Sequence, residues 1–335
     1  MPAEWEKHIG TWVTYPHEKT TFFEYLEQAR DIFVQMVKII SEGETVHINV
    51  NDNQMKKDLQ NRLKKFDVNL KNTVIHIFPT NDSWCRDYGA IFVKKTNNKL
   101  VATDWEFNAW GGKYPYELDN QIAKKMAEYL NVEYLKVDMV LEGGSIDTNG
   151  DGIFLTTESC LLNPNRNPDK TKEEIEEYLS KYLGAEKVLW LKEGIVGDDT
   201  DGHIDDITRF VGKNKIITAL ETNPDDENYQ ILKENFERLK SFKNKEGKPF
   251  EIITLPMPEP RYYKGERLPA SYANFYISSS AVIVPIYNCP QDQEALDVLQ
   301  SVFKDRKVIG LDANPIIVGL GAFHCLTQQI PEGEI

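Results

Sequence analysis

Helical and strand-like patterns alternate along this chain of 335 residues from its first segment to its last. Residues 19–43 carry apolar side chains at the three- and four-residue spacing of a helix, and the apolar run at 45–50 predicts a strand. The same change of pattern recurs as far as the helix expected at 291–303, in about five strand–helix groups. No linker or low-complexity segment interrupts them, so the sequence predicts an α/β fold in which residues 1–335 form a single domain.

The charge balance limits the partners of the protein. The sequence has 39 Lys and Arg against 53 Asp and Glu, which gives a net charge of −14 at neutral pH. A nucleic-acid scaffold would carry an excess of basic residues to displace counterions, so we expect no nucleic-acid partner. A negatively charged surface instead attracts small cationic molecules.

Neither a membrane span nor a secretion signal is recognisable in the sequence. No window approaches the ~18 consecutive apolar residues of a membrane helix, and the start MPAEWEKHIGTW mixes charged and aromatic residues, unlike a signal peptide. The four cysteines stand far apart without a CxxC pair, which argues against a zinc clamp. We expect a cytoplasmic protein with reduced cysteines and no membrane partner. A homodimer is expected only because symmetric dimers are the commonest assemblies.

Rare polar residues stand beside glycines in four segments that follow or interrupt apolar strands. These segments are 81–90 (NDSWCRDYGA), 141–146 (LEGGSI), 198–206 (DDTDGHIDD) and 319–325 (GLGAFHC). Each contributes one or two groups that can bind a cation, move a proton or attack carbon.

Cys325 is a candidate nucleophile because the glycines before it permit a tight turn and the close approach of a ligand. The alternative is a buried structural cysteine, which is the commoner role of a lone cysteine. We expect that structural role for the other three cysteines: Cys85, Cys160 and Cys289.

His203 and Asp205 form an H-x-D pair whose side chains would share one face if the segment were extended. An imidazole is the natural proton shuttle near neutral pH, so His203 is the candidate acid–base group. His324 adjoins Cys325 and would point to the opposite face of a strand, so it is not expected to be the base. The remaining histidines are expected to be structural or to lie at the surface: His8, His17, His47 and His76.

Asp87, Glu142 and Asp205 could bring three carboxylates near the thiol. Such neighbours raise the pKa of a thiol and disfavour the thiolate, so they suit a substrate that brings its own positive charge. A guanidinium is planar, permanently charged and matched to paired carboxylates. This set of residues therefore suits attack by a thiol on the central carbon of a guanidinium.

Segments spread over nearly the whole chain resemble the agmatine deiminase and bacterial peptidylarginine deiminase family of the guanidine-modifying superfamily. They are MPAEWEKHIGTWVTYP, NDSWCRDYGAIFV, FNAWGGKY, LEGGSI, DTDGHIDDITRFV, SYANFYI and GLGAFHCLTQQIP. The resemblance implies a five-bladed α/β propeller with pseudo-fivefold symmetry, which agrees with the strand–helix groups counted above. It also implies a reaction that uses no metal and no organic cofactor.

Position by position, the resemblance implies that Cys325 is the nucleophile and His203 the general acid and base. Asp87 and Asp205 match the carboxylates that hold the guanidinium, and Glu142 matches the carboxylate that orients the imidazole. The implied reaction is hydrolytic deimination through a covalent amidino-thioether on Cys325. The net negative charge favours agmatine as the substrate, with N-carbamoylputrescine and ammonia as products.

The second charged group of the substrate separates three candidates, namely agmatine, free arginine and peptidylarginine. Asp199, four residues before His203, could face the distal ammonium of agmatine, and Trp84 could wall its aliphatic chain. Free arginine would need a cation for its carboxylate, but Arg86 and Arg209 are each expected in a structural ion pair.

The sequence departs from the usual family pattern at three positions. Leu320 stands in the middle of a run that is often GGG, Asp147 at a position that is often His, and Cys85 in place of a larger apolar residue. Leu320 and Cys85 bear on the shape of the pocket, while no proposed catalytic group is lost.

Two alternatives from other functional classes remain open. Asp147–Glu158 fits the EF-hand pattern D-x-[DN]-x-[DN]-G-x5-E, which suggests a calcium-binding module. However, the flanking segments 137–146 and 152–157 look like strands of a hairpin, whereas an EF-hand needs helices on both sides. A cysteine protease or amidase that used Cys325 and His203 would leave the three carboxylates without a role.

Overall fold

The computed structural model of the protein describes all residues, 1–335. Five sheets of three or four strands form its framework, and each sheet continues an antiparallel pair with a parallel strand. Within each sheet the strands are named in the order in which neighbours pair. The first sheet consists of β18 (Thr327–Pro331), β1 (His8–Thr14), β2 (Thr45–Val50) and β3 (Thr73–Ile77). The other four consist of β4 (Ile91–Lys94), β5 (Leu100–Glu106) and β6 (Glu133–Val140); β7 (Asp147–Thr148), β8 (Ile153–Thr157) and β9 (Lys187–Leu191); β10 (Thr208–Gly212), β11 (Lys215–Leu220) and β12 (Glu251–Pro256); and β15 (Tyr276–Ile277), β16 (Ala281–Ile286) and β17 (Lys307–Asp312). A separate two-stranded ribbon consists of β13 (Tyr262–Tyr263) and β14 (Glu266–Arg267).

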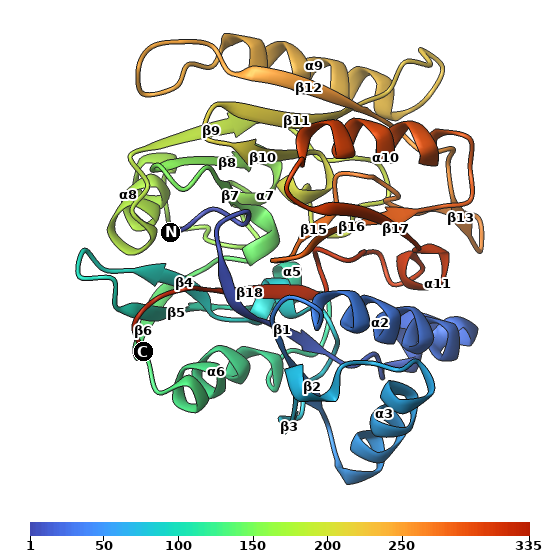
Figure 1. Cartoon of the computed structure of the whole chain (residues 1–335). Helices are drawn as coiled ribbons and strands as arrows, with labels where there is room; N and C mark the ends of the chain where they lie inside the picture. Colours follow the sequence, from blue (N-terminus) through green and yellow to red (C-terminus); the bar gives the residue numbers. More distant parts are fainter.

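Helices connect the parallel strands and lie around the outside of the molecule (Figure 1). They are α2 (Leu26–Ile40), α3 (Asn53–Lys65), α6 (Ile122–Leu130), α8 (Lys172–Leu183), α9 (Asn228–Ser241) and α10 (Gln291–Val302). Parallel strands need such crossover connections, because the chain must return along the full length of one strand before it can begin the next in the same direction. The five groups expected from the sequence correspond to these five sheets with their helices.

The first expected helix is interrupted. Residues 19–40 form α1 (Lys19–Phe22), a 3₁₀ turn η1 (Phe23–Tyr25) and α2, because Phe23 takes a φ of 48° and stops the first helix. Residues 41–43, expected at the end of the helix, form a turn. The apolar spacing continues across the break, so periodicity alone does not reveal it. The helix expected at 53–65, in contrast, is α3 with those bounds.

The strand expected at 137–146 is displaced in the structure, because β6 begins at Glu133 and shares only residues 137–140 with the expected range. Strand β6 ends at Val140, and a 3₁₀ turn, η4 (Gly143–Ser145), follows it. The hairpin therefore joins β7 to β8, and β6 instead pairs in parallel with β5. The turn made by the two glycines takes Glu142 out of the sheet and toward the other polar segments.

The two ends of the chain meet in one sheet, where β18 pairs antiparallel with β1 (Figure 1). The largest cluster of buried apolar side chains runs through this sheet and the sheet of β15–β17, and it includes Trp84 and Cys325. Polar residues are carried by short elements that contact one another: α4 (Cys85–Tyr88) contacts η4 and β18, and η4 contacts η5 (Ile204–Asp206). None of the helices combines the length and apolar character needed to cross a lipid bilayer.

Candidate active site

Cys325 lies in the turn that leads into β18, with its side chain almost fully buried. Trp84 packs against the glycines before it, and a Cβ on Gly321 would stand only 2.6 Å from the Trp84 ring. Glycine is therefore required at this position for the indole to lie beside the thiol. Burial, followed by the charge of Asp205 and of the neighbouring carboxylates, raises the pKa of the Cys325 thiol well above its usual range.

His203 is fully buried beside the same carboxylates. Its Nδ1 lies 3.8 Å from Asp87 Oδ1 and 3.9 Å from Asp205 Oδ1. Burial disfavours the charged imidazole, but Asp87 foremost, followed by Cys160 and Asp205, outweighs burial and raises the pKa of His203 well above its usual range. Neither ring nitrogen has a hydrogen-bond partner within the protein, so a protonated His203 can give its proton to a bound molecule.

The segment around His203 is not extended, contrary to the assumption behind the H-x-D pattern. The 3₁₀ turn η5 follows His203 directly. The side chain of Asp198 holds the preceding loop by accepting a hydrogen bond from the His203 backbone N–H at 3.0 Å. A turn, and not strand alternation, brings His203 and Asp205 to the same side.

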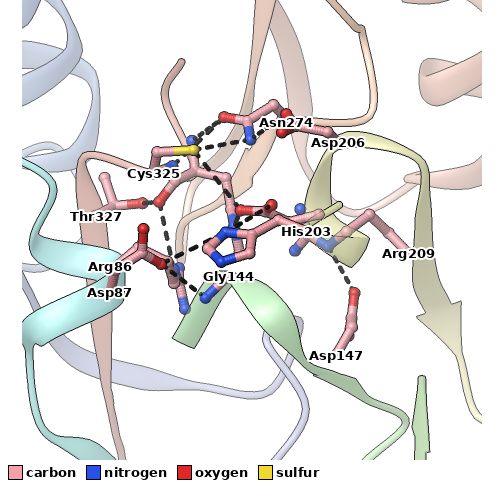
Figure 2. A network of polar contacts seen from close by, with 12 residues as sticks. Arg86, Asp87, Gly144, Asp147, His203, Asp206, Arg209, Asn274, Cys325 and Thr327 are labelled. Carbon is pink, nitrogen blue, oxygen red and sulfur yellow. Dashed lines mark hydrogen bonds and ion pairs between the residues drawn. The ribbon is translucent and has the colours of Figure 1, made fainter. Parts of the chain in front are cut away.

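Asp87 is held by donors on both carboxylate oxygens. The Gly144 backbone N–H donates to Oδ1 at 3.0 Å (Figure 2). Trp110 Nε1 donates to Oδ2 at 3.0 Å. Burial raises the pKa of Asp87 to about 6, although the nearby His203 acts in the opposite direction. A Cβ on Gly144 would stand 2.6 Å from His203 Nδ1 and 2.8 Å from Asp87 Oδ1, so only glycine lets these two groups approach.

Asp205 is positioned by His324, which comes from the segment that also carries Cys325. His324 Nδ1 lies 2.6 Å from Asp205 Oδ2, and its Nε2 lies 2.8 Å from Glu4 Oε2. Both ring nitrogens of His324 are therefore occupied by carboxylates, which leaves His203 as the free imidazole. Burial opposes the ionisation of Asp205, but its contacts with His324 lower its pKa below the usual value.

Glu142 lies near the imidazole without a hydrogen bond to it. Glu142, Cys160 and His203 each place one polar atom within 4.8 Å of the others, and all three are buried. Glu142 Oε1 accepts a hydrogen bond from Arg166 Nε at 2.6 Å, while Oε2 has no partner. The role of Glu142 in orienting His203 stays a prediction, and Cys160, expected to be only structural, is a neighbour of the same imidazole.

The other predicted residues have more definite surroundings. Asp199 accepts a hydrogen bond from the Tyr114 hydroxyl at 2.7 Å and lies 3.4 Å from Lys113 Nζ, so it is tied to the α5 loop (α5, Ala109–Gly112) and not to the carboxylates around Cys325. Arg86 and Arg209 both form buried ion pairs with Glu4, at 3.3 and 3.0 Å, as expected.

Three residues that the sequence interpretation did not assign to the site contact it directly. Asn274 Nδ2 donates to Cys325 Sγ at 3.0 Å, and Asp206 accepts from the same amide group at 2.9 Å. Trp110, the third, reaches Asp87 from a backbone with φ 55°. The sequence contained a signal for two of them, because Asn274 lies in SYANFYI and Trp110 lies in FNAWGGKY. Both segments are among those that carry the family resemblance.

The EF-hand alternative is wrong. Its twelve residues form the hairpin of β7 and β8 with the turn between them, and no α-helix leads into it. Its first acidic residue, Asp147, is paired with Arg209, and its last, Glu158, is paired with Lys172 and Arg238. Two other buried groups each bring three side chains that could bind a metal cation within 4.8 Å of one another. One group is Glu142, Cys160 and His203, and the other is Asp205, Asp206 and Cys325.

Comparisons with known proteins agree with this geometry. The model of the Porphyromonas-type peptidyl-arginine deiminase family matches residues 1–331. A Legionella pneumophila protein that is provisionally named an agmatine deiminase is 39% identical over 335 residues, covering 99% of this chain and 94% of its own length. The structure of a cysteine-to-serine variant of the C. jejuni agmatine deiminase, with substrate bound, is 36% identical, with a TM-score of 0.90 and 100% and 96% of the two chains covered. The agmatine deiminase of Enterococcus faecalis is 30% identical, with a TM-score of 0.92 and 99% and 95% covered.

More distant structures show the class of fold. An amidinotransferase from Microseira wollei is 14% identical with a TM-score of 0.50, and a cyanobacterial arginine dihydrolase is 11% identical with a TM-score of 0.54. The protein thus has a mixed α/β fold similar to that of these two proteins. Within that class, the chain belongs to the Porphyromonas-type peptidyl-arginine deiminase family, and it is a deiminase-type hydrolase of C–N bonds.

Proposed function

We propose that the protein hydrolyses the guanidinium group of agmatine to N-carbamoylputrescine and ammonia, with residues 1–335 acting as one deiminase domain. The observation that carries this proposal is the position of one buried imidazole, His203, less than 4 Å from two buried carboxylates beside Cys325. Asp87 and Asp205 could hold a planar cation through paired hydrogen bonds while the sulfur faces its carbon.

The proposed reaction has two covalent steps. The thiolate of Cys325 adds to the guanidinium carbon, and His203 gives its proton to the departing nitrogen, which leaves as ammonia. The carbon then remains bound to sulfur as an amidino-thioether. Neutral His203 next takes a proton from water, and the resulting hydroxide adds to the carbon. The C–S bond then breaks and the hydroxyl proton leaves for solvent, which gives the urea product and the thiolate.

The raised pKa of Cys325 fits a cationic substrate. Carboxylates disfavour the thiolate in the free enzyme, whereas a bound guanidinium would neutralise them and favour it. The protonated His203 would act in the same direction. A protease or amidase reaction on an uncharged amide would gain nothing from this arrangement.

Agmatine is favoured over free arginine because Arg86 and Arg209 are already paired within the protein. The names of the C. jejuni and E. faecalis relatives support agmatine, while the name of the family model supports peptidylarginine as the alternative. Asp199 would hold the distal ammonium only if it released Lys113. Trp84, beside the glycines that precede Cys325, is proposed to pack along the aliphatic chain.

The test is the rate of ammonia release from agmatine, free arginine and a peptide ending in arginine, measured side by side at equal concentration. We expect agmatine to give the highest kcat/KM. A preference for the peptide would support the alternative, and release from none of the three would refute a deiminase of these guanidines.

Binding of agmatine should weaken in acid because Asp87 must be charged to hold the cation. With the pKa of Asp87 raised to about 6, the carboxyl is neutral below that pH and charged above it. The Kd of agmatine should therefore increase about tenfold per pH unit below 6 and level off above it. Calorimetry on a Cys325→Ala variant measures this without turnover, and Asp87→Asn is the control that should bind weakly at every pH. A Kd that stayed constant from pH 5 to 7 would contradict the role of Asp87.

We also propose that the five sheets are arranged as a five-bladed α/β propeller with pseudo-fivefold symmetry. Their shared strand order supports this arrangement. Cytoplasmic action in polyamine biosynthesis, as a homodimer and without metal or organic cofactor, completes the proposal.

A further inference from the structure

Lys113 is the cation that contacts Asp199, and it follows directly on α5. Its Nζ lies 3.4 Å from Asp199 Oδ1 and 3.1 Å from Asp201 Oδ1, and it donates a hydrogen bond to the Asp199 backbone oxygen. The Tyr114 hydroxyl donates to Asp199 Oδ2 at 2.7 Å. An ammonium and the hydroxyl of the next residue therefore occupy both oxygens of this carboxylate.

The group that Lys113 presents to Asp199 has the chemistry of one end of agmatine. A lysine side chain is an ammonium on a flexible stem of four carbons. Agmatine likewise carries an ammonium on a four-carbon chain beyond its guanidinium. In the free protein Asp199 thus already binds the kind of group that the substrate would bring.

We propose that Lys113 is a specificity-determining residue, whose ammonium occupies Asp199 in the free protein and competes there with the distal ammonium of the substrate. The inference deepens the proposed function and rests on Asp199 being the contact for that ammonium. No covalent bond changes in the exchange, in which one ammonium leaves the carboxylate and another replaces it. Lys113 therefore weakens the binding of a dication, but not that of a guanidinium with an uncharged chain.

The exposure of the pair makes the exchange feasible. The Lys113 side chain is 28% exposed and that of Asp199 is 34% exposed, so water screens the attraction between them. Asp201 lies within reach of the same Nζ and can keep Lys113 when Asp199 is released. A rotation of the flexible lysine stem is then sufficient, and its charge is not left without a partner.

The loop that carries Lys113 also reaches the centre of the candidate site. Trp110, three residues earlier, donates from Nε1 to Asp87 Oδ2 at 3.0 Å. The loop therefore contacts the carboxylate proposed for the guanidinium as well as the one proposed for the distal ammonium. Its backbone is fixed at Gly111, where φ is 98° and a Cβ would overlap the Asn165 side chain. The exchange at Asp199 is thus expected to move the Lys113 side chain and not the Trp110 contact.

The experiment measures binding by calorimetry, without turnover, in the Cys325→Ala background. Its two ligands are agmatine and pentylguanidine, in which a methyl group replaces the distal ammonium. Lys113→Met removes the charge at similar length, whereas Lys113→Arg keeps it. Lys136→Met is the matched control, because Lys136 is also partly exposed and also contacts two carboxylates, Asp104 at 3.4 Å and Glu106 at 2.8 Å.

We expect Lys113→Met to lower the Kd of agmatine at least about threefold, because the ligand no longer displaces a competing cation. The Kd of pentylguanidine should change by less than about twofold, and Lys113→Arg should keep the ratio of the two Kd values found with Lys113. Where Cys325 is retained, Lys113→Met should lower the KM of agmatine by a similar factor and leave kcat unchanged. Lys136→Met should change neither Kd.

Three results would overturn the proposal. An agmatine Kd that is unchanged or higher in Lys113→Met would mean that Lys113 does not compete with the distal ammonium. Equal changes for both ligands would mean that the loop acts on the guanidinium end through Trp110, and the same change in Lys136→Met would mean a general effect of net charge. Ammonia release with an unchanged Kd would leave the proposed function standing without this inference, whereas tighter binding without ammonia release would do the reverse.

Discussion

Ammonia release from agmatine should fall by at least about 10⁴-fold in Cys325→Ala, because no other group near the substrate can form the covalent bond to carbon. Binding should survive, since Asp87 and Asp205 hold the cation and neither depends on the thiol for its position. The measurement is a coupled ammonia assay for turnover together with calorimetric titration of agmatine.

The matched control is Cys289→Ala. Cys289 is also a free cysteine, but its sulfur lies 3.1 Å from the Tyr272 hydroxyl and outside the group of carboxylates around Cys325. Its replacement should leave ammonia release near the native rate. Near-native release by Cys325→Ala would refute the assignment of the nucleophile, and loss in both variants would point to a general effect on folding.

The sequence located the segments of the candidate site better than the contacts within it. Glycines beside rare polar residues marked the four segments that carry Asp87, Glu142, His203 and Cys325, and the structure brings them together. These signals are local, because a glycine next to a charged residue can be seen without knowing the fold. Which nitrogen or oxygen faces which partner depends on chain segments far apart in the sequence.

Glu4 illustrates what the sequence could not predict. A glutamate in the first turn of a chain is expected at the surface, because an ionised carboxylate is rarely buried. It is buried here only because Arg86, Arg209 and His324 arrive from three other parts of the chain. In the same way, the donor role of Asn274 requires the backbone of residues 324–325 to occupy its oxygen first.

The fold was predictable to a similar degree. Periodicity gave the helices and the strands, including α3, because apolar spacing is a local property. It did not give the break at Phe23 or the exit from β6 after Val140, where turns interrupt a continuing apolar pattern. Both misses are places where backbone dihedral angles override the side-chain pattern.

Arg209→Met should lower the free energy of unfolding by about 3–5 kcal/mol, the usual cost of removing one partner from a buried ion pair. Arg209 is buried, its Nε lies 2.5 Å from Asp147 Oδ2, and it also contacts Glu4. Glu4 would keep Arg86 and His324. Asp147 would keep no cation, so its charge would remain buried and unpaired. Equilibrium unfolding in urea measures the loss.

The dependence of this loss on pH identifies its cause. Burial raises the pKa of Asp147 and Arg209 lowers it, so without Arg209 the folded protein favours the neutral carboxyl. The unfolded chain ionises Asp147 near its ordinary pKa, so the destabilisation of the variant should grow as the pH rises from 5 to 8. A loss that did not change with pH would indicate that missing packing, and not the unpaired charge, is responsible.

A second replacement separates the unpaired charge from the missing side chain. Asp147→Asn in the Arg209→Met background removes the charge at nearly constant shape, so the double variant should recover part of the lost stability. Lys215→Met is the control for an exposed ion pair, since Lys215 lies 3.1 Å from Glu251 at the surface and should contribute less than about 1 kcal/mol. Additive losses in the double variant would contradict the pairing of Arg209 with Asp147. Recovery would show that Asp147 is tolerated at this buried position because Arg209 accompanies it.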